Sequence, residues 1–162
     1  MHFNKNEYTK LISYILSNCY TKPHVGKTVI TTTMYFIDFN HYEVYGNSIT
    51  NETYIKTKKG IKPSHFHKIT EELINKNRIY FRKENYYGNI LHKYYLTRIP
   101  NVKFSKEKLE IINPTIKQLL NKNATIILRY ASKDTPVKKT DFNMEISYKD
   151  VQTRNPQYSM LK

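Results

Sequence analysis

The sequence is poor in the residues that form cross-links and tight turns. Among its 162 residues there are one cysteine, no tryptophan, four glycines and six prolines. Cys19 stands alone, so it can form no disulfide within the chain and cannot build a structural zinc site, which fits a reducing compartment. The scarcity of glycine and proline argues against a β-sandwich with many turns. A chain of this length is expected to form one domain with a substantial core.

Long apolar runs are also missing. No stretch approaches about 18 consecutive apolar residues, the length that a membrane-spanning helix needs. The first ten residues, MHFNKNEYTK, lack the apolar run of a signal peptide. We therefore expect a soluble, cytoplasmic protein with no membrane partner.

Acidic residues are outnumbered by basic ones, 13 to 27, which gives a formal net charge of +14. Residues 54–108 hold 14 basic and 4 acidic side chains, so this third of the chain carries +10 of the total. Such a charge indicates an acidic partner: a nucleic acid, an anionic membrane or an acidic protein surface. A composition rich in lysine, asparagine and tyrosine, with a solvated basic face, would give the same count. Charge alone therefore does not choose a function.

Patterns typical of catalysis or metal binding are absent. None of the six histidines stands four residues from another, and there is no glycine-rich phosphate loop or nucleophile elbow. Asp38 and His41 lie three residues apart and could touch on a helix. A hydrogen-bonded pair beneath a loop is favoured over a catalytic dyad at this position. We expect no enzymatic activity, no cofactor and no metal.

Apolar periodicity predicts helices over much of the chain. A first helix, capped by Asn6, carries a single apolar stripe that ends at Cys19. A second helix runs over residues 27–45 and stops at Gly46, although its opening run 29–33 is β-branched and a poor helix former. Ser64 caps a third helix that ends near Asn77.

Two further helices are predicted in the second half of the chain. Ser105 starts a fourth helix, which Pro114 should kink or break in two. Thr125 caps a short fifth helix over residues 126–133, and residues 134–136 terminate it. The remainder of the chain is polar and mostly extended.

The extended segments indicate one small hairpin. Residues 78–82 and 90–99 predict two strands joined by a loop that contains Asn85 and Gly88. Residues 47–62 predict a loop with a short extended piece around residues 54–56. The fold class expected is α+β and predominantly helical: a single compact domain over residues 1–150 with a small β-hairpin. Residues 151–162 are expected to form a flexible tail.

Several short motifs occur in one order along the chain. They are MYFIDFNH at 34–41, Tyr-Gly at 45–46, Ser-Ile-Thr at 48–50 followed by Tyr54, Lys-Gly at 59–60 followed by Pro63, and Ser-Lys-Asp-Thr-Pro at 132–136. This pattern, spread over roughly residues 9–148, resembles the SocA-like Panacea domain of bacterial and phage antitoxins. Two departures stand out: Ile61 replaces the first proline of the family's Gly-Pro-Val-Pro turn, and the histidine and tryptophan of its His-x-Asp-x-Pro-Trp element are Ser132 and Val137.

The motif residues are expected to serve the architecture of the fold, with the loop after Gly46 folded back on the second helix and Tyr54 packed inward. They are Tyr35, Asp38, His41, Gly46, Ile49, Thr50, Tyr54, Gly60, Pro63, Asp134, Pro136, Ile146 and Tyr148.

The resemblance implies an antitoxin that neutralises a cognate toxin, usually encoded nearby, by direct protein–protein binding. A tyrosine- and arginine-rich surface suits such a contact. We expect it to comprise the hairpin and the loop before the third helix, at Lys56, Lys58, Lys59, Lys62, Tyr80, Arg82, Lys83, Tyr86, Tyr87, Lys93 and Arg98. Nucleic acid is the alternative partner, since a helix followed by a basic hairpin is typical of a winged-helix regulator. A proteolytic adaptor and a phage-encoded counter-defence protein are further alternatives on the same scaffold.

Overall fold

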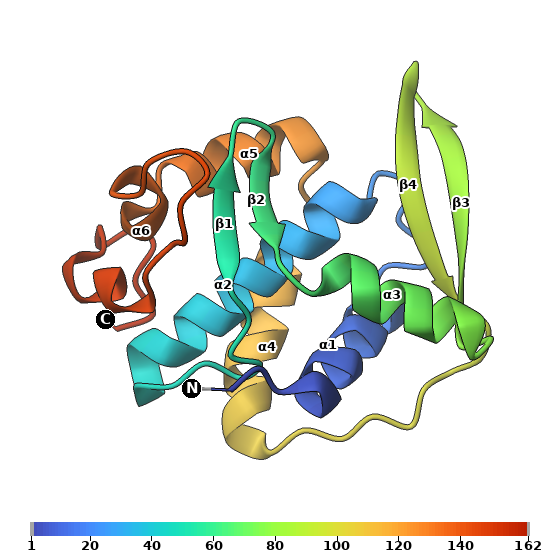
Figure 1. Ribbon diagram of the computed structural model, residues 1–162, viewed down its shortest axis with the longest axis horizontal. Coiled ribbons are helices and arrows are strands. Elements are labelled where there is room, and N and C mark those ends of the chain that lie inside the picture. The colour runs from blue at the N-terminus through green and yellow to red at the C-terminus, as the bar shows by residue number, and fades with distance from the viewer. Residues whose placement is uncertain (1, 162) are drawn as a thin grey trace.

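The computed structural model describes residues 2–161, and most of its regular secondary structure is helical (Figure 1). The α-helices are α1 (Lys5–Ser17), α2 (Lys27–Tyr45), α3 (Phe66–Asn75), α4 (Lys106–Leu119), α5 (Ala124–Ser132) and α6 (Thr135–Lys138), and a 3₁₀ helix, η1, spans Tyr148–Thr153. The strands are β1 (Tyr54–Thr57), β2 (Gly60–Pro63), β3 (Ile79–Tyr86) and β4 (Asn89–Leu96). The predicted α+β, predominantly helical class is confirmed.

Helix α2 is the centre of the fold and crosses the molecule diagonally in Figure 1. Every residue of α2 from Val29 to His41 is buried, and the helix contacts α4, α5, β2 and η1. Burial on all sides explains why the β-branched run 29–33 is helical, because tertiary packing overrides weak intrinsic propensity. The hydroxyls of Thr31 and Thr32 donate to the carbonyls of Lys27 and Thr28, so these polar groups are satisfied inside the core.

Glycine ends α2 as predicted. Gly46 has a left-handed φ of 77°, and its N–H donates to the carbonyl of Tyr42 at 2.8 Å. Glycine adopts this conformation without a Cβ penalty, which is why it is common just after helices.

The predicted helix starts are correct for α2 and α4 and wrong by one or two residues for α1, α3 and α5. Ser105 caps α4 through its side chain, as expected. The cap of α1 is Asn4, whose side chain accepts from the N–H of Glu7, and not Asn6. Asn123 caps α5 in the same way, ahead of Thr125. In both cases an earlier asparagine offers its side-chain oxygen first.

Two other local predictions need correction. Ser64 does not cap α3: its hydroxyl donates to the carbonyl of Thr53, and His65 precedes the helix instead. Pro114 does not break α4, which runs without interruption through that residue. Proline removes one main-chain hydrogen bond, and the buried face of α4, including Ile112 and Ile116, holds the two halves together.

The structure has two hairpins within residues 2–161 where one was expected. In the first, β1 pairs antiparallel with β2. The extended piece predicted around residues 54–56 is confirmed as β1, and the loop predicted after it is wrong because residues 60–63 form β2. In the second, β3 and β4 pair over eight residues each, from Ile79 opposite Leu96 to Tyr86 opposite Asn89. The first hairpin escaped prediction because its strands are only four residues long and include a glycine and a proline.

The expected flexible tail is also wrong, because the described part of residues 151–162 packs on the body of the domain. Val151, Arg154 and Tyr158 are buried. The hydroxyl of Tyr158 donates to the carbonyl of Tyr130 in α5, and the N–H of Met160 donates to Glu43 in α2. Apolar burial and hydrogen bonds spread over this segment hold it in place.

Candidate partner-binding cleft

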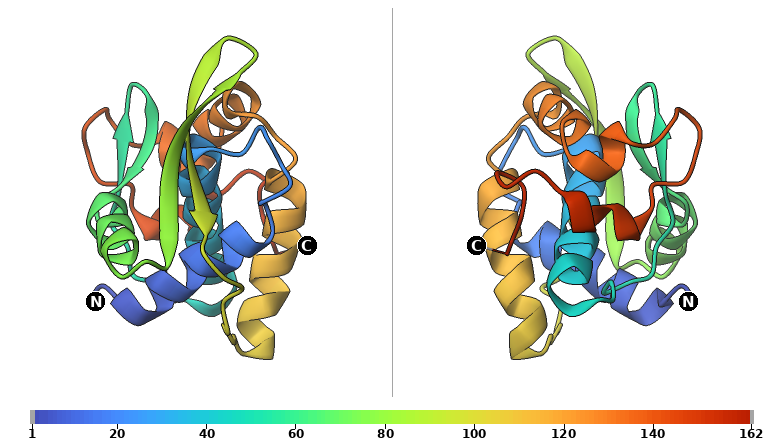
Figure 2. Two further views of the ribbon diagram at one scale, coloured as in Figure 1. Left: turned by 90° about the vertical axis from the view of Figure 1, so that its right-hand side faces the viewer. Right: turned by 90° about the vertical axis from the view of Figure 1, so that its left-hand side faces the viewer.

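The two hairpins rise at the same end of the molecule, with the beginning of α2 between them (Figures 1 and 2). They flank a cleft of about 540 Å³. Its walls are residues 59–63 of the first hairpin and 90–92 of the second, and its remaining sides come from the first turn of α2, the start of α3 and two residues of α5, Ala124 and Leu128. We call this the hairpin cleft. It brings together segments that are far apart in the sequence.

Basic side chains line the hairpin cleft, and no aspartate or glutamate does. The basic set is Lys27, Lys59, Lys62, His24, His67 and His92. Among the described residues, none of the three lysines lies within 4.0 Å of a carboxylate. The start of α2 adds partial positive charge, because no side chain caps its first N–H groups. The cleft therefore favours anionic groups.

The second hairpin is shaped by its turn. Tyr87 and Gly88 both have positive φ, 49° and 83°, and the N–H of Gly88 donates to Oδ1 of Asn85 at 3.0 Å. Two-residue turns of this kind match the twist of antiparallel strands. The turn carries the tip of the hairpin away from the core, where Tyr87 is 89% exposed.

Strand alternation gives this hairpin two different faces. One carries Phe81, Ile90, His92 and Tyr94, and it borders the cleft through Ile90 and His92. Its rings form a row: Phe81 lies 5.4 Å from His92 and 5.3 Å from Tyr94, centroid to centroid, and Tyr94 lies 5.5 Å from Phe66 of α3. Ile90 is 61% exposed at the upper end of this row.

The other face carries a separate aromatic and charged cluster. Tyr80 stacks on Tyr95 with centroids 5.2 Å apart, and the guanidinium of Arg82 lies 5.4 Å from the Tyr80 ring. The hydroxyl of Tyr95 donates to Glu84 at 2.5 Å, and burial and this carboxylate raise the pKa of Tyr95 to about 12. Arg82 and Lys83, neighbours in sequence, thus point to opposite sides of the hairpin.

Most of the side chains predicted to contact a partner are exposed, and the structure places them on or beside the two hairpins. The exposed ones are Lys58, Lys59, Lys62, Tyr80, Arg82, Lys83, Tyr87 and Arg98, and Tyr86 is half-buried. Only Lys59 and Lys62 of this set line the hairpin cleft.

Two of the predicted contact residues have structural roles instead. Lys93 is only 4% exposed, and its Nζ donates to the carbonyls of Lys22 and Pro23, which fixes the hairpin to the connector before α2. Burial lowers the pKa of Lys93. Lys56 is half-buried, with its Nζ donating to the carbonyl of Thr140 at 2.8 Å. Strand alternation turns both lysines inward, which a count of basic residues does not reveal.

Lys27, Ile90 and His92 are among the cleft residues that the sequence did not single out. A signal for the last two was present, because residues 90 and 92 fall on one face once the register of the hairpin is known. Lys27 gave no signal, since it lies far from the hairpins in sequence and reaches the cleft only through the packing of α2.

Asp38 holds the loop after α2 against that helix. Its carboxylate accepts from the N–H groups of Ile49 and Thr50 and from the hydroxyls of Thr50 and Tyr54, at 2.5 to 3.0 Å. Asp38 is fully buried, and burial raises its pKa to about 6, against the opposing effect of these four hydrogen bonds. His41 binds the same loop, with Nδ1 2.6 Å from the carbonyl of Asn47. The expected pairing of Asp38 with His41 is wrong, because each side chain has its own partners in the loop.

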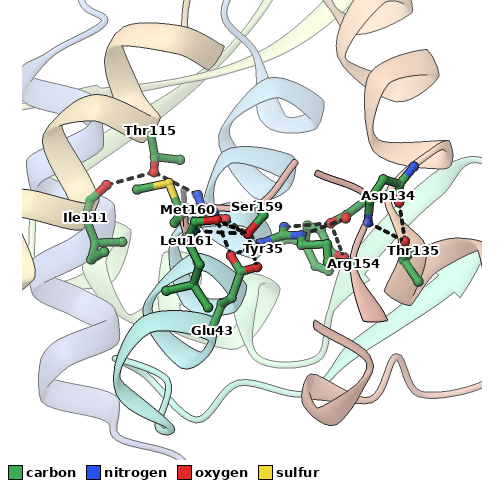
Figure 3. A network of polar contacts seen from close by, with 12 residues as sticks. Tyr35, Glu43, Ile111, Thr115, Asp134, Thr135, Arg154, Ser159, Met160 and Leu161 are labelled. Atoms are coloured by element: carbon green, nitrogen blue, oxygen red, sulfur yellow. Dashed lines mark hydrogen bonds and ion pairs between the residues drawn. The ribbon is translucent and has the colours of Figure 1, made fainter. Parts of the chain in front are cut away.

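A second buried network joins the end of the described chain to α2 and α6 (Figure 3). The guanidinium of Arg154 donates to both carboxylate oxygens of Asp134, at 2.8 and 2.7 Å, and its Nη1 donates to Asn40 and to Glu43. Tyr35 donates its hydroxyl to Asp134 at 2.9 Å. Two parallel hydrogen bonds to one carboxylate are the strongest geometry that arginine offers.

The comparison with protein families decides what this architecture is. The model described as "Antitoxin SocA-like, Panacea domain" matches residues 32–137, well over half of the chain. The chain belongs to this family. No curated protein and no solved structure matches the chain.

The Panacea match covers α2, both hairpins and α3 to α5, so it contains every wall of the hairpin cleft except His24, Gly26 and the start of α2. It is shorter than the resemblance over residues 9–148. Ile146 and Tyr148 lie outside the match. Both contact the segment around β1: the N–H of Ile146 donates to the carbonyl of Tyr54, and the hydroxyl of Tyr148 donates to the carbonyl of Glu52. Arg154, the partner of Asp134, also lies outside it.

The Panacea motif residues lie largely in the interior and not in the cleft. The buried ones are Tyr35, Asp38, His41, Ile49, Thr50, Tyr54, Pro63, Asp134, Pro136 and Ile146. Tyr148 is half-buried, Gly46 is exposed, and Gly60 and Pro63 also line the cleft. Within residues 2–161, no group of three or more histidine, cysteine, aspartate or glutamate side chains is arranged to hold a metal ion. None of the helices described in this part of the chain is long and apolar enough to cross a membrane.

Proposed function

We propose that this Panacea-domain protein is an antitoxin that neutralises a toxin by binding it directly, and that the face formed by the two hairpins makes the contact. One observation carries the proposal: the second hairpin exposes large apolar and aromatic side chains beside a cleft lined only by basic charge. Tyr87 and Ile90 are 89% and 61% exposed, and Tyr80 is 41% exposed. Grouped exposed apolar residues next to charged ones are typical of protein–protein interfaces.

The composition of this face suits rapid and tight capture of an acidic protein. Tyrosine and arginine dominate binding hot spots because they bury a large area with few rotatable bonds. The net charge of +14 speeds encounter with a negative partner by electrostatic steering.

The proposal assigns binding, and no chemical step, to this chain. The carboxylates with the most elaborate surroundings, Asp38 and Asp134, are both fully buried, and other parts of the fold occupy their oxygens. Each one therefore stabilises the fold. The match to the antitoxin family also supports a binding role of this kind.

Co-expression with the products of adjacent genes tests the proposal. We expect one of these products to arrest growth, and co-expression of this chain to restore growth and yield a stoichiometric complex. The double variant Tyr87→Ala/Ile90→Ser should weaken the complex at least tenfold, since it removes two exposed apolar anchors. Met144→Ser, at a residue 58% exposed on a different loop, is the matched control and should leave binding unchanged. Equal loss in both variants, or no complex with any adjacent product, would overturn the proposal.

Charge reversal on the second hairpin tests the same face through the rate of association. Arg82→Glu/Lys83→Glu should slow association with the toxin in a salt-dependent manner, because exposed charges act mainly on the on-rate. An unchanged on-rate at low salt would show that the second hairpin is not part of the interface.

Nucleic-acid binding is the second candidate, and one observation favours it. Helix α3 is followed directly by the β3–β4 hairpin, the order of a helix with a basic wing, and the hairpin carries the exposed pair Tyr80 and Arg82. A gel-shift assay with duplex DNA and single-stranded RNA over a salt series tests it. A log–log slope of affinity against salt near zero dismisses phosphate-driven binding. Adaptor and counter-defence roles would use the same binding face, and growth rescue on co-expression separates an antitoxin from both.

A further inference from the structure

The free edge of β2 faces the hairpin cleft. Lys56 of β1 donates its N–H to the carbonyl of Met144 at 3.0 Å and accepts from the N–H of Asn143 at 2.6 Å. Both main-chain groups of Lys56 therefore point away from β2. Because Lys56 stands opposite Ile61, the antiparallel pattern turns the N–H and the carbonyl of Ile61 away from β1 as well, toward the other edge.

Within residues 2–161, no main-chain group pairs with the free edge of β2 at Ile61. Residues 143–146 cover the outer side of β1, with a bridge between Ile55 and Glu145. No hydrogen bond from another described segment reaches the N–H or the carbonyl of Ile61. An unpaired edge of this kind is a template for an added strand. The N–H is a feature of this chain, since Ile61 stands where the family turn has a proline.

The charge around the edge selects what can pair with it. Lys59 and Lys62 flank Ile61 on the same hairpin, and Lys27 stands at the start of α2 on the floor of the cleft. Lysines on an edge strand repel a second copy of this chain, whose net charge is +14. They attract carboxylates. Side chains of an added strand would also meet the apolar wall formed by Phe66, Ile90 and Leu128.

We propose that the hairpin cleft receives an extended acidic segment of the protein partner, which pairs its backbone with the β2 edge at Ile61 and its carboxylates with Lys27, Lys59 and Lys62. This inference rests on the proposed function, which supplies a protein partner, and it adds the chemistry and the conformation of the segment bound. A peptide fits better than a nucleic acid because the β2 edge offers a main-chain donor and acceptor at Ile61, and no arginine lines the cleft.

The test uses a fluorescein-labelled decapeptide of alternating glutamate and valine as probe, followed by fluorescence anisotropy. The cleft variant is Lys27→Gln/Lys59→Gln/Lys62→Gln. The matched control, Lys106→Gln/Lys117→Gln/Lys133→Gln, removes the same charge at exposed positions outside the cleft. We expect the cleft variant to lose at least tenfold in affinity for the peptide and the control to change less than threefold.

Ile61→Pro tests the edge itself. The substitution removes the N–H that points into the cleft and leaves the β1–β2 ladder intact, since that N–H takes no part in it. We expect this variant to fold with an unchanged circular dichroism spectrum and to bind the decapeptide at least threefold more weakly. Amide shifts in ¹H–¹⁵N NMR spectra of the wild type should concentrate at Ile61, Lys62 and Ile90 on addition of the decapeptide.

Three outcomes overturn the inference: equal loss of affinity in the cleft and control variants, amide shifts away from the cleft, or tighter binding of a twenty-nucleotide oligo-dT to the same amides. The last outcome assigns the cleft to nucleic acid. A complex with a toxin that forms equally well with the cleft variant leaves the antitoxin function standing and removes only the acidic-segment inference. Absence of any toxin complex, together with cleft-specific peptide binding, removes only the proposed function.

Discussion

The guanidinium of Arg154 donates two parallel hydrogen bonds to the carboxylate of Asp134, from Nε at 2.8 Å and from Nη2 at 2.7 Å, and both residues are buried. Both side chains are completely buried, and Glu43 approaches the same guanidinium at 3.2 Å. Such a pair adds little net stability compared with apolar residues of equal volume, but breaking it leaves an uncompensated charge in the interior. The pair therefore makes the fold depend on both partners at once.

We predict that Arg154→Met lowers the free energy of unfolding by about 3–5 kcal/mol, since methionine keeps the apolar stem and removes only the charge and its donors. Lys139→Met is the matched control. Its Nζ lies 4.0 Å from Asp150, and the two side chains are 48% and 30% exposed, so loss of the pair should cost about 0–1 kcal/mol. Urea denaturation of both variants measures the difference. Similar midpoints for the two would show that the buried pair is dispensable.

Shortening the chain to end at Asp150 should be more damaging than Arg154→Met. The deletion removes Arg154 and also the buried side chains of Val151 and Tyr158, which pack on the core. We expect loss of a cooperative thermal transition in calorimetry. A truncated chain that melts within a few degrees of the full chain would restore the view of this segment as a loose tail.

Acidification should stabilise the wild type relative to Asp38→Asn. The ordinary pKa of an aspartate is 3.8, and burial raises the pKa of Asp38 to about 6 in the folded chain. Between these values the folded state binds the proton more tightly than the unfolded state, so the free energy of unfolding rises as pH falls from about 6 to about 4. The expected gain is at most about 3 kcal/mol over that window. Asparagine does not titrate, so the wild-type-minus-variant difference isolates Asp38.

Denaturation of both proteins at pH 4.5 and pH 7.5 gives that difference, and ¹³C NMR of the Asp38 carboxyl gives the midpoint directly. A midpoint below 4 would mean that the four hydrogen bonds to the carboxylate outweigh its burial.

Gly60 and Gly46 should respond differently to alanine. Gly60 has φ of +116°, and a Cβ there would lie 2.5 Å from Cδ2 of Leu128, whereas Gly46 has φ of +77° and open space around it. We expect Gly46→Ala to cost about 1 kcal/mol from backbone strain alone. Gly60→Ala should cost about 2–4 kcal/mol, because strain and the collision with α5 act together. Thermal denaturation of both variants gives the comparison, and equal losses would mean that Leu128 moves aside freely.

Lys93 should contribute to stability and not to binding, unlike Lys83 on the other face of the hairpin. Lys93→Met removes the donor that the carbonyls of Lys22 and Pro23 share and should cost about 1–3 kcal/mol. Lys83→Met, at an exposed site, should change stability by less than about 0.5 kcal/mol. Hydrogen exchange of the β3–β4 amides provides a second readout, since weaker docking of the hairpin speeds their exchange. Identical exchange rates in the two variants would contradict this role.

Sequence patterns were sufficient to predict the helices and strands that short-range interactions determine. The extent of α2 follows from apolar periodicity and from Gly46, and the second hairpin follows from alternation around Asn85 and Gly88. Helix starts were missed where two capping residues compete within a few positions, as Asn4 and Asn6 do. Side-chain oxygens at either position can satisfy the first N–H groups, so only the fold chooses between them.

Features that depend on distant segments were not predictable in this way. In the sequence, Arg154 is one more basic residue in a polar segment, and nothing near it marks Asp134 as its partner. The cleft was missed for the same reason: Lys27, Lys62 and His92 come from three separate elements that only tertiary packing brings together. The direction of Lys93 required the strand register, which fixes the face of every side chain at once.

Asp134 and Arg154 stand 20 positions apart in the chain, and the same guanidinium also donates to Asn40 and Glu43 of α2. One side chain therefore connects three separate stretches of the sequence. A substitution that displaces any of these partners leaves the others with fewer hydrogen bonds, so the three stretches cannot vary independently of one another.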